Sequence, residues 1–220
     1  MSDLWTLADV DRDGAIQEAA AKVDPITRAS FLKKAGLGAG ALVGGGALMS
    51  AIPSLAMASG SVAKSDVAIL NFALTLEYLE AAFYAEAVSM GNFSGNAGTF
   101  AKIVSAHENA HVAFLKGALG SAAVKKPSFD FKGTTTDESK FKATAQVLED
   151  TGVAAYLGQV GNIKSKAILS AAGSILPVEA RHAGWIRDIN GVSGAPTAFQ
   201  GAKTKAEVLA AVKSTGFIVS

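Results

Sequence analysis

The feature that most constrains this chain is a polar pattern that occurs twice on otherwise apolar segments. In each copy a lone glutamate is followed by the sequence Glu-x-x-His, with 31 residues from Glu77 to Glu108 and 30 from Glu149 to Glu179. The full pattern is Glu77, Glu108 and His111 in the first copy, and Glu149, Glu179 and His182 in the second. Each copy has the length of two helices joined by a turn, so the repeat predicts two similar helical hairpins.

Apolar residues at spacings of three and four predict helices throughout this region and no strand. The segments are residues 66–91, 96–120, 138–162 and 165–191, with a short fifth helix at 205–216. We expect Gly91 and Gly120 to end the first two helices and Asp137 to cap the third. The one long loop, residues 125–137, lies between the second and third helices. The prediction is an all-α four-helix bundle in which this loop crosses from one end of the bundle to the other.

Residues 27–60 have the layout of an export signal. A basic start that includes Arg28 precedes an apolar stretch rich in glycine and alanine, and Ala58 ends a small-residue pattern typical of cleavage sites. The start resembles a twin-arginine signal, but Ala29 stands where the second arginine belongs. We expect export to the periplasm or cell envelope with cleavage after Ala58. If the segment is retained, it is expected to be an apolar helix that contacts a partner or a membrane.

Residues 9–20 begin like a calcium-binding EF-hand loop, with Asp9, Asp11 and Asp13 at alternating positions. Such a loop needs a glutamate at its last position that gives both carboxylate oxygens to the ion. Ala20 stands there instead. The sequence therefore favours a solvated acidic turn over a calcium site.

The chain is expected to have three parts. Residues 1–60 form the polar lead-in and export-signal-like apolar segment, residues 61–195 the four-helix bundle, and residues 196–220 a tail with a short helix. A net charge of +1 gives no bulk attraction for nucleic acid, so no nucleic-acid partner is expected.

The repeated Glu-x-x-His places two ligands on one helix face. Residues three apart are neighbours on a helix, so each copy directs one oxygen and one nitrogen to the same point. Packing the hairpins face to face would bury four carboxylates, which is prohibitively costly unless cations balance their charge. Two divalent ions would do so. The sequence therefore predicts a dinuclear metal site held by Glu77, Glu108, His111, Glu149, Glu179 and His182.

The ligand types restrict the metal. The chain has no cysteine, so any metal must be bound by oxygen and nitrogen. Oxygen-rich sites with one imidazole for each metal suit iron or manganese better than zinc or copper. We expect two divalent ions, with iron favoured over manganese.

The sequence leaves the role of Glu80 open. It lies one turn after Glu77 and could replace Glu77 as a ligand or support the site from behind. The repeat favours Glu77 as the ligand, because Gly152 occupies the position equivalent to Glu80.

Three further residues lie near the pattern. Tyr84 and Tyr156 are two turns beyond the lone glutamates, where they could hydrogen-bond ligands, carry electrons or pack in the core, and the core role is favoured. His107 points about 100° away from Glu108 around its helix, so we expect it to be peripheral.

The residues in this pattern resemble a known family. Glutamates and Glu-x-x-His motifs on four helices resemble the di-metal carboxylate pattern of ferritin-like proteins. The segments "LNFALTLEYLEAAFYAEAV" and "ILPVEARHAGWIRDI" resemble bacterial ferritin-like domain proteins, which often follow an export signal and are sometimes linked to desiccation or stress. The resemblance covers about residues 65–190. It implies a ferritin-like bundle in which the lone glutamates are terminal ligands and the Glu-x-x-His glutamates bridge the metals.

Two functions are expected from this pattern. The first is a dinuclear iron or manganese protein that oxidises Fe(II) or handles peroxide under oxidative stress, with O2 or peroxide and Fe(II) as substrates. The second is a metal-stabilised scaffold without turnover that self-assembles at the envelope. Charged residues make up only 18% of the chain, which is compatible with self-association, and a homo-oligomer is expected.

Overall fold

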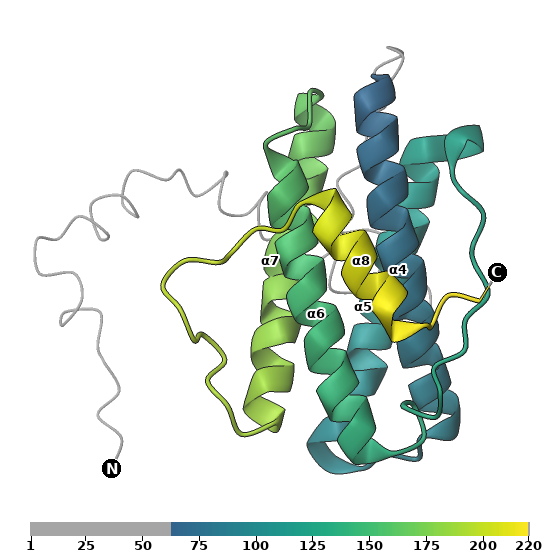
Figure 1. The fold of residues 1–220 in the computed structure, drawn as a ribbon, viewed down its shortest axis with the longest axis vertical. Helices are drawn as coiled ribbons and strands as arrows, with labels where there is room; N and C mark the ends of the chain where they lie inside the picture. Colours follow the sequence, from purple (N-terminus) through teal and green to yellow (C-terminus); the bar gives the residue numbers. More distant parts are fainter. Residues whose placement is uncertain (1–62, 220) are drawn as a thin grey trace, which may run out of the picture. The chain divides into compact units, whose positions relative to one another are not determined.

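The computed structural model describes residues 63–219. The expected apolar N-terminal helix, export signal and acidic turn lie outside the described residues. Within residues 63–219 the helices are α4 Lys64–Met90, α5 Gly95–Leu119, α6 Glu138–Val160, α7 Lys166–Ile189 and α8 Lys205–Thr215, with a 3-10 turn, η2, at Gly120–Ala122 (Figure 1). The same range contains no strand, and its one isolated β-bridge pairs Phe129 with Ile218. The all-α prediction is confirmed.

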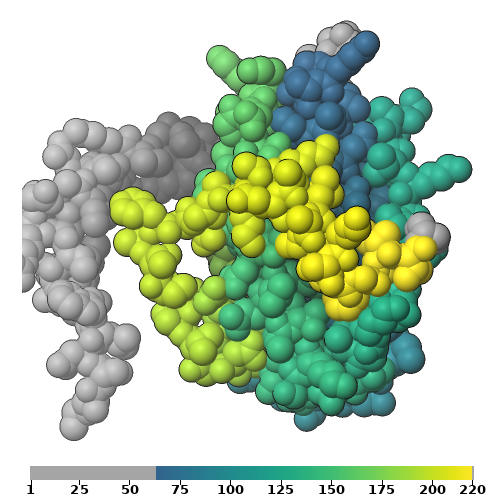
Figure 2. All heavy atoms as spheres, in the orientation of Figure 1, coloured from purple at the N-terminus to yellow at the C-terminus, as the bar shows by residue number. Residues whose placement is uncertain are grey.

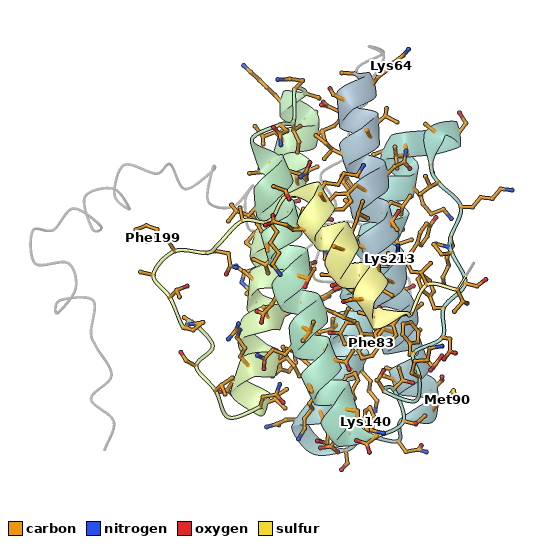
Figure 3. All side chains as sticks on the ribbon, in the orientation of Figure 1. Lys64, Phe83, Met90, Lys140, Phe199 and Lys213 are labelled. Atoms are coloured by element: carbon orange, nitrogen blue, oxygen red, sulfur yellow. The ribbon has the colours of Figure 1, made fainter. Side chains whose placement is uncertain are left out.

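The four long helices form two hairpins, α4–α5 and α6–α7, which pack face to face. Figure 3 shows Lys64 and Met90 at opposite ends of α4, so this helix runs the full height of the bundle. The connection between α5 and α6 runs from one end of the bundle to the other (Figure 1). The predicted crossover between the second and third helices is therefore confirmed.

The helix ends follow the predicted signals closely. Asp137 caps α6, and its carboxylate accepts a hydrogen bond of 2.9 Å from the backbone N–H of Lys140. Helix α5 ends before Gly120, whose φ of 53° lies in the region that favours glycine. The first helix begins at Lys64, two residues earlier than predicted, and the third ends at Val160, two residues earlier. No side-chain cap marks the start of α4, and α6 ends directly before Gly161, so both differences are of the one or two residues usual for helix ends.

The core contains two apolar clusters. Along α4, Leu70 and Leu74 belong to one cluster, whereas Phe72 and Leu76 before the glutamates and Phe83 after them belong to the other. Phe83 stacks on Phe141 of α6 with ring centroids 5.5 Å apart. The polar residues thus form a layer within the bundle, with packed apolar side chains on both sides along the helix axes.

Two aspartates tie the helices together. Asp66 at the start of α4 is fully buried, and its carboxylate accepts hydrogen bonds from the backbone N–H groups of Lys164 and Ser165 just before α7. Asp150 of α6 receives two hydrogen bonds from the guanidinium of Arg187 on α7, at 3.0 and 2.6 Å. These contacts fix the relative positions of the helices that carry the site.

The short helix α8 lies across α6 and covers part of the face of the bundle seen in Figure 2. Its side chains Val208 and Val212 are buried. The segment before α8 approaches α6 closely, and Lys203 N–H donates to the carbonyl of Ala154 at 3.0 Å. A Cβ at Gly158 would collide with the Lys203 carbonyl oxygen, so glycine is required at this contact.

Helix α4 is apolar and long enough to cross a membrane by length and composition alone, but 67% of its most apolar window is buried inside the bundle. Glu77 and Glu80 are among the buried residues of this helix. Burial in the core between the other helices accounts for its composition.

Candidate metal centre

The six residues of the repeated pattern meet in the middle of the bundle. One glutamate comes from each of α4, α5, α6 and α7, and the histidines come from α5 and α7. All four glutamates are fully buried. His182 is 3% exposed, and the side chain of His111 is 12% exposed. The helical spacing and the packing of two hairpins together produce this arrangement, as the sequence predicted.

The ligand atoms fall into two groups, in each of which one atom from every residue lies within 4.8 Å of the others. The first group, the His111 position, is Glu77, Glu108, His111 and Glu179. The second group, the His182 position, is Glu108, Glu149, Glu179 and His182. The two groups share Glu108 and Glu179. The two carboxylates that belong to Glu-x-x-His are thus placed where each can face both positions.

The His111 position is built around one ring nitrogen. His111 Nδ1 lies 3.2 Å from Glu77 Oε2, 3.3 Å from Glu108 Oε2 and 3.0 Å from Glu179 Oε1. Three carboxylates from three helices therefore converge on a single nitrogen. A cation between them would be surrounded by three oxygens and one nitrogen.

The His182 position uses the same ring atom from the opposite hairpin. His182 Nδ1 lies 3.2 Å from Glu108 Oε1 and 3.4 Å from Glu149 Oε2. Glu108 presents Oε2 to His111 and Oε1 to His182. One carboxylate thus faces both positions with different oxygens.

Buried polar atoms without partners test whether a cation fits here. Within residues 63–219 the buried side-chain atoms that lack a hydrogen bond are Glu108 Oε1, Glu149 Oε2, Glu179 Oε1, Glu179 Oε2 and His182 Nδ1. All belong to the two groups. Burying such atoms unpaired is costly, whereas coordination to a cation satisfies oxygens and a nitrogen at once. The cluster is compatible with divalent metal binding.

The cluster holds protons when no metal is bound. Burial, with the nearby charges of Glu179 and Glu77, holds the pKa of Glu108 well above its ordinary value. Burial and the charge of Glu77 raise the pKa of Glu179 to about 7. Burial opposes protonation of His111, but Glu77 and the other carboxylates raise its pKa overall. Burial alone would raise the pKa of Glu77, but the charge of His111 together with hydrogen bonds from His111, Glu108 and Tyr156 lowers it overall. Protons therefore occupy atoms that a metal would contact.

Each tyrosine on the site face hydrogen-bonds a glutamate of the opposite hairpin. Tyr84 OH donates to Glu149 Oε1 at 2.5 Å, and Tyr156 OH donates to Glu77 Oε1. Burial raises the pKa of both phenols well above the ordinary value, so both remain protonated donors. The tyrosines are core residues, as favoured from the sequence, and they also hydrogen-bond the predicted ligands. These bonds leave one oxygen of each lone glutamate directed at the site.

The prediction that His107 is peripheral is wrong. His107 Nδ1 lies 2.8 Å from His182 Nε2, and the two rings stack with centroids 5.1 Å apart. Burial, followed by the positive charges of His182 and His111, lowers the pKa of His107, so its neutral Nδ1 can accept a hydrogen bond from His182 Nε2–H. His107 is offset by about 100° from Glu108 around α5, and in this direction its side chain meets α7. The spacing of four between His107 and His111 places both on one face and could have revealed this role.

Glu80 belongs to neither group, although it is 3% exposed. Burial and the charges of Glu149 and Glu179 raise its pKa well above the ordinary value. The structure thus brings a fifth carboxylate to the edge of the site, while Glu77 occupies the ligand-like place that the repeat favoured.

The fold and site define a helical bundle with a buried cluster of carboxylates and imidazoles. Residues 65–192 match the family model of the ferritin-like domain. This match spans more than half of the chain, so the chain belongs to the ferritin-like domain family. Among curated proteins no match was found.

Proposed function

We propose that this protein binds two metal ions, iron in preference to manganese, and acts in Fe(II) oxidation or in the handling of peroxide. The observation that carries the proposal is the pair of ligand groups sharing Glu108 and Glu179, with five partnerless buried atoms directed into them. Glu77 and His111 would hold one ion, Glu149 and His182 the other, and the shared carboxylates both.

Two bound iron ions would supply electrons in pairs, which suits the two-electron reduction of peroxide and the activation of O2. The protein's own residues would prepare the site for this. Tyr84 and Tyr156 hold the terminal carboxylates in place through their hydrogen bonds. His107 fixes the ring of His182 so that Nδ1 faces the carboxylates. Such supporting contacts orient ligands and tune the metal.

An apolar cavity beside the site favours a small uncharged substrate. It has a volume of about 20 Å³ and is lined by apolar side chains that include Leu76, Leu115 and Ile175, together with Tyr156. Tyr156 also hydrogen-bonds Glu77, so the cavity and the cluster share a side chain. A space of this size with a mostly apolar lining accommodates a molecule as small as O2.

The test is metal loading followed by turnover. Protein stripped with a chelator and reloaded with Fe(II) without oxygen is expected to hold two iron ions per chain, and then to consume O2 or peroxide as further Fe(II) is added. The matched controls are Glu108→Ala, expected to lose metal and turnover, and the exposed Glu138→Gln, expected to retain both. Two bound ions without turnover would favour the metal-stabilised scaffold. Absence of bound metal would refute the proposal.

We also propose export to the periplasm or envelope and assembly into a homo-oligomer. The basic start, the apolar stretch and the small residues ending at Ala58 support export. The mass of the chain from the cell envelope under denaturing conditions tests cleavage after Ala58, and its native mass tests the oligomer. A full-length monomer in the cytoplasm would contradict both.

A further inference from the structure

Glu80 is a buried carboxylate that the two ligand groups leave without a role. It lies one helical turn after Glu77 on α4 and is 3% exposed. Keeping a carboxylate at this depth, beside four others, is costly unless it makes a compensating contact. Its position therefore requires an explanation beyond packing.

Gly152 on α6 provides the space that Glu80 occupies. A Cβ at Gly152 would lie 3.2 Å from Glu80 Oε1 and 3.5 Å from Glu179 Oε2. The two carboxylates thus border the same small space, and any larger side chain at 152 would intrude on both. Glu80 consequently reaches across from α4 toward α6 and α7.

Glu179 Oε2, which lies beside the same space as Glu80, belongs to a residue that both ligand groups share. Glu179 Oε2 has no hydrogen-bond partner within residues 63–219, and the same holds for Glu149 Oε2 and His182 Nδ1. All three atoms are buried and belong to residues of the His182 position. The charges that most raise the pKa of Glu80, after burial itself, are those of Glu149 and Glu179, ahead of Glu108 and Glu77.

The internal repeat shows that this feature is one-sided. Aligning Glu77 with Glu149 places Glu80 opposite Gly152. At this position of the repeat, the hairpin α4–α5 contributes the carboxylate of Glu80, and the hairpin α6–α7 contributes Gly152, which leaves space for it. No equivalent carboxylate can approach the His111 position from α6.

We propose that Glu80 is an additional ligand of the metal in the His182 position, so that the two metals have unlike coordination and unequal affinity. This inference rests on the proposed two-metal site. The His111 position then has three carboxylates and one imidazole, and the His182 position has four carboxylates and one imidazole. The difference in ligand number between the two positions comes from Glu80 and the space at Gly152, because the repeated ligands are the same in both hairpins.

The test is a titration of the metal-free full chain with Co(II), whose absorption spectrum reports coordination number. The unmodified protein is expected to bind two Co(II) ions in two distinct steps. Glu80→Gln keeps the size of the side chain but removes its charge. It is expected to weaken one step about tenfold or more, to lower the coordination number of that ion, and to leave the other step unchanged.

Two variants serve as comparisons. Gly152→Ala places a Cβ 3.2 Å from Glu80 Oε1, so it is expected to displace the carboxylate and weaken the same step by a smaller factor. Glu138→Gln removes a half-exposed carboxylate at the start of α6 and is expected to change neither step. Circular dichroism of each variant confirms that the helices are retained.

The outcomes separate this inference from the proposed function. If Glu80→Gln leaves both steps and both spectra unchanged, Glu80 is not a ligand, and the two-metal site stands. If Glu80→Gln weakens both steps equally, its effect is a general one of charge, and the inference is again overturned. If the unmodified chain binds no Co(II), both proposals fall.

Discussion

The hairpin α4–α5 and the hairpin α6–α7 carry the same polar residues in the same order, but their other residues differ. Each supplies a lone glutamate, a Glu-x-x-His and a tyrosine that hydrogen-bonds the glutamate of the other hairpin. The first hairpin also carries Glu80 and His107, where the second has Gly152 and Val178. His107 contacts His182, and Glu80 lies beside Gly152 and Glu179.

This difference shows that equal ligand sets can have unequal surroundings. His182 is 3% exposed and stacks against His107, whereas the side chain of His111 is 12% exposed and faces three carboxylates. A metal in the His182 position would be enclosed and supported by a second ring. A metal in the His111 position would be nearer to solvent. The two positions are therefore expected to load and release ions differently.

The largest effect is expected from the two shared carboxylates, where the hairpins are equivalent. Glu108→Ala and Glu179→Ala should each abolish binding of both ions, because each glutamate belongs to both groups. Glu77→Ala and Glu149→Ala should each leave one ion bound. Metal content after dialysis, measured with circular dichroism on the same samples, checks this. One ion retained in Glu108→Ala would show that the carboxylate does not bridge.

Acid should remove metal from both positions, and first from the His111 position. Metal binding needs Glu179 ionised and His111 neutral, but without metal the pKa of Glu179 is about 7 and that of His111 is raised. Below pH 7 both groups are protonated, so protons compete and affinity falls, by about tenfold per pH unit for each proton displaced. Affinity should rise again as the pH increases toward 8.

Metal titrations between pH 6 and pH 8 measure this dependence. His111 faces three carboxylates and His182 two, so the ion beside His111 is expected to leave at the higher pH. Equal loss of both ions, or affinity independent of pH, would contradict the expected inequality of the two positions.

His107 and Val178 provide a matched pair for sharpening the comparison. Val178 holds the place in the second hairpin that His107 holds in the first. His107→Ala removes the ring that fixes His182 and should weaken one metal about 10- to 100-fold, as expected for a supporting partner. Val178→Ala should leave both affinities unchanged. Stepwise binding constants distinguish these results, and unchanged binding in His107→Ala would make its contact with His182 incidental.

The smallest effect on metal binding is expected from the tyrosines, where the hairpins are again equivalent. Tyr84→Phe and Tyr156→Phe each remove one hydrogen bond to a buried carboxylate and should retain both metals. Each should lower the free energy of unfolding of the metal-free protein by about 1.5–3 kcal/mol. Urea unfolding measures this loss. A large loss from only one variant would show that the two sides of the bundle support their glutamates unequally.

Much of the fold could be predicted from the sequence, because helix periodicity and end signals are local. The spacing of Phe72, Leu76 and Phe83 sets one buried face on α4, and Asp137 marks the start of α6. The long segment before Asp137 is long enough to connect opposite ends of a bundle, which favoured the crossover. The observed start of α4 at Lys64 is two residues before the predicted start. No capping side chain marks this helix end in the sequence.

The site was predicted less completely at its edges. His107 was misplaced because the angle between it and Glu108 on one helix does not say which neighbouring helix fills that direction. The direction in which Glu80 points was open for a similar reason. It depends on the space beside Gly152, which belongs to a helix 72 positions further along the chain.

The sequence by itself determined that this protein is a helical bundle and which six polar residues come together in its centre. Backbone geometry repeats every 3.6 residues, so a Glu-x-x-His shares one face wherever its helix lies. Only the tertiary structure decided that Glu108 and Glu179 lie in both ligand groups, that His107 supports His182, and that Glu80 faces the opposite hairpin. Those contacts depend on how each helix is rotated against its neighbours, which is set by the packing of the whole core.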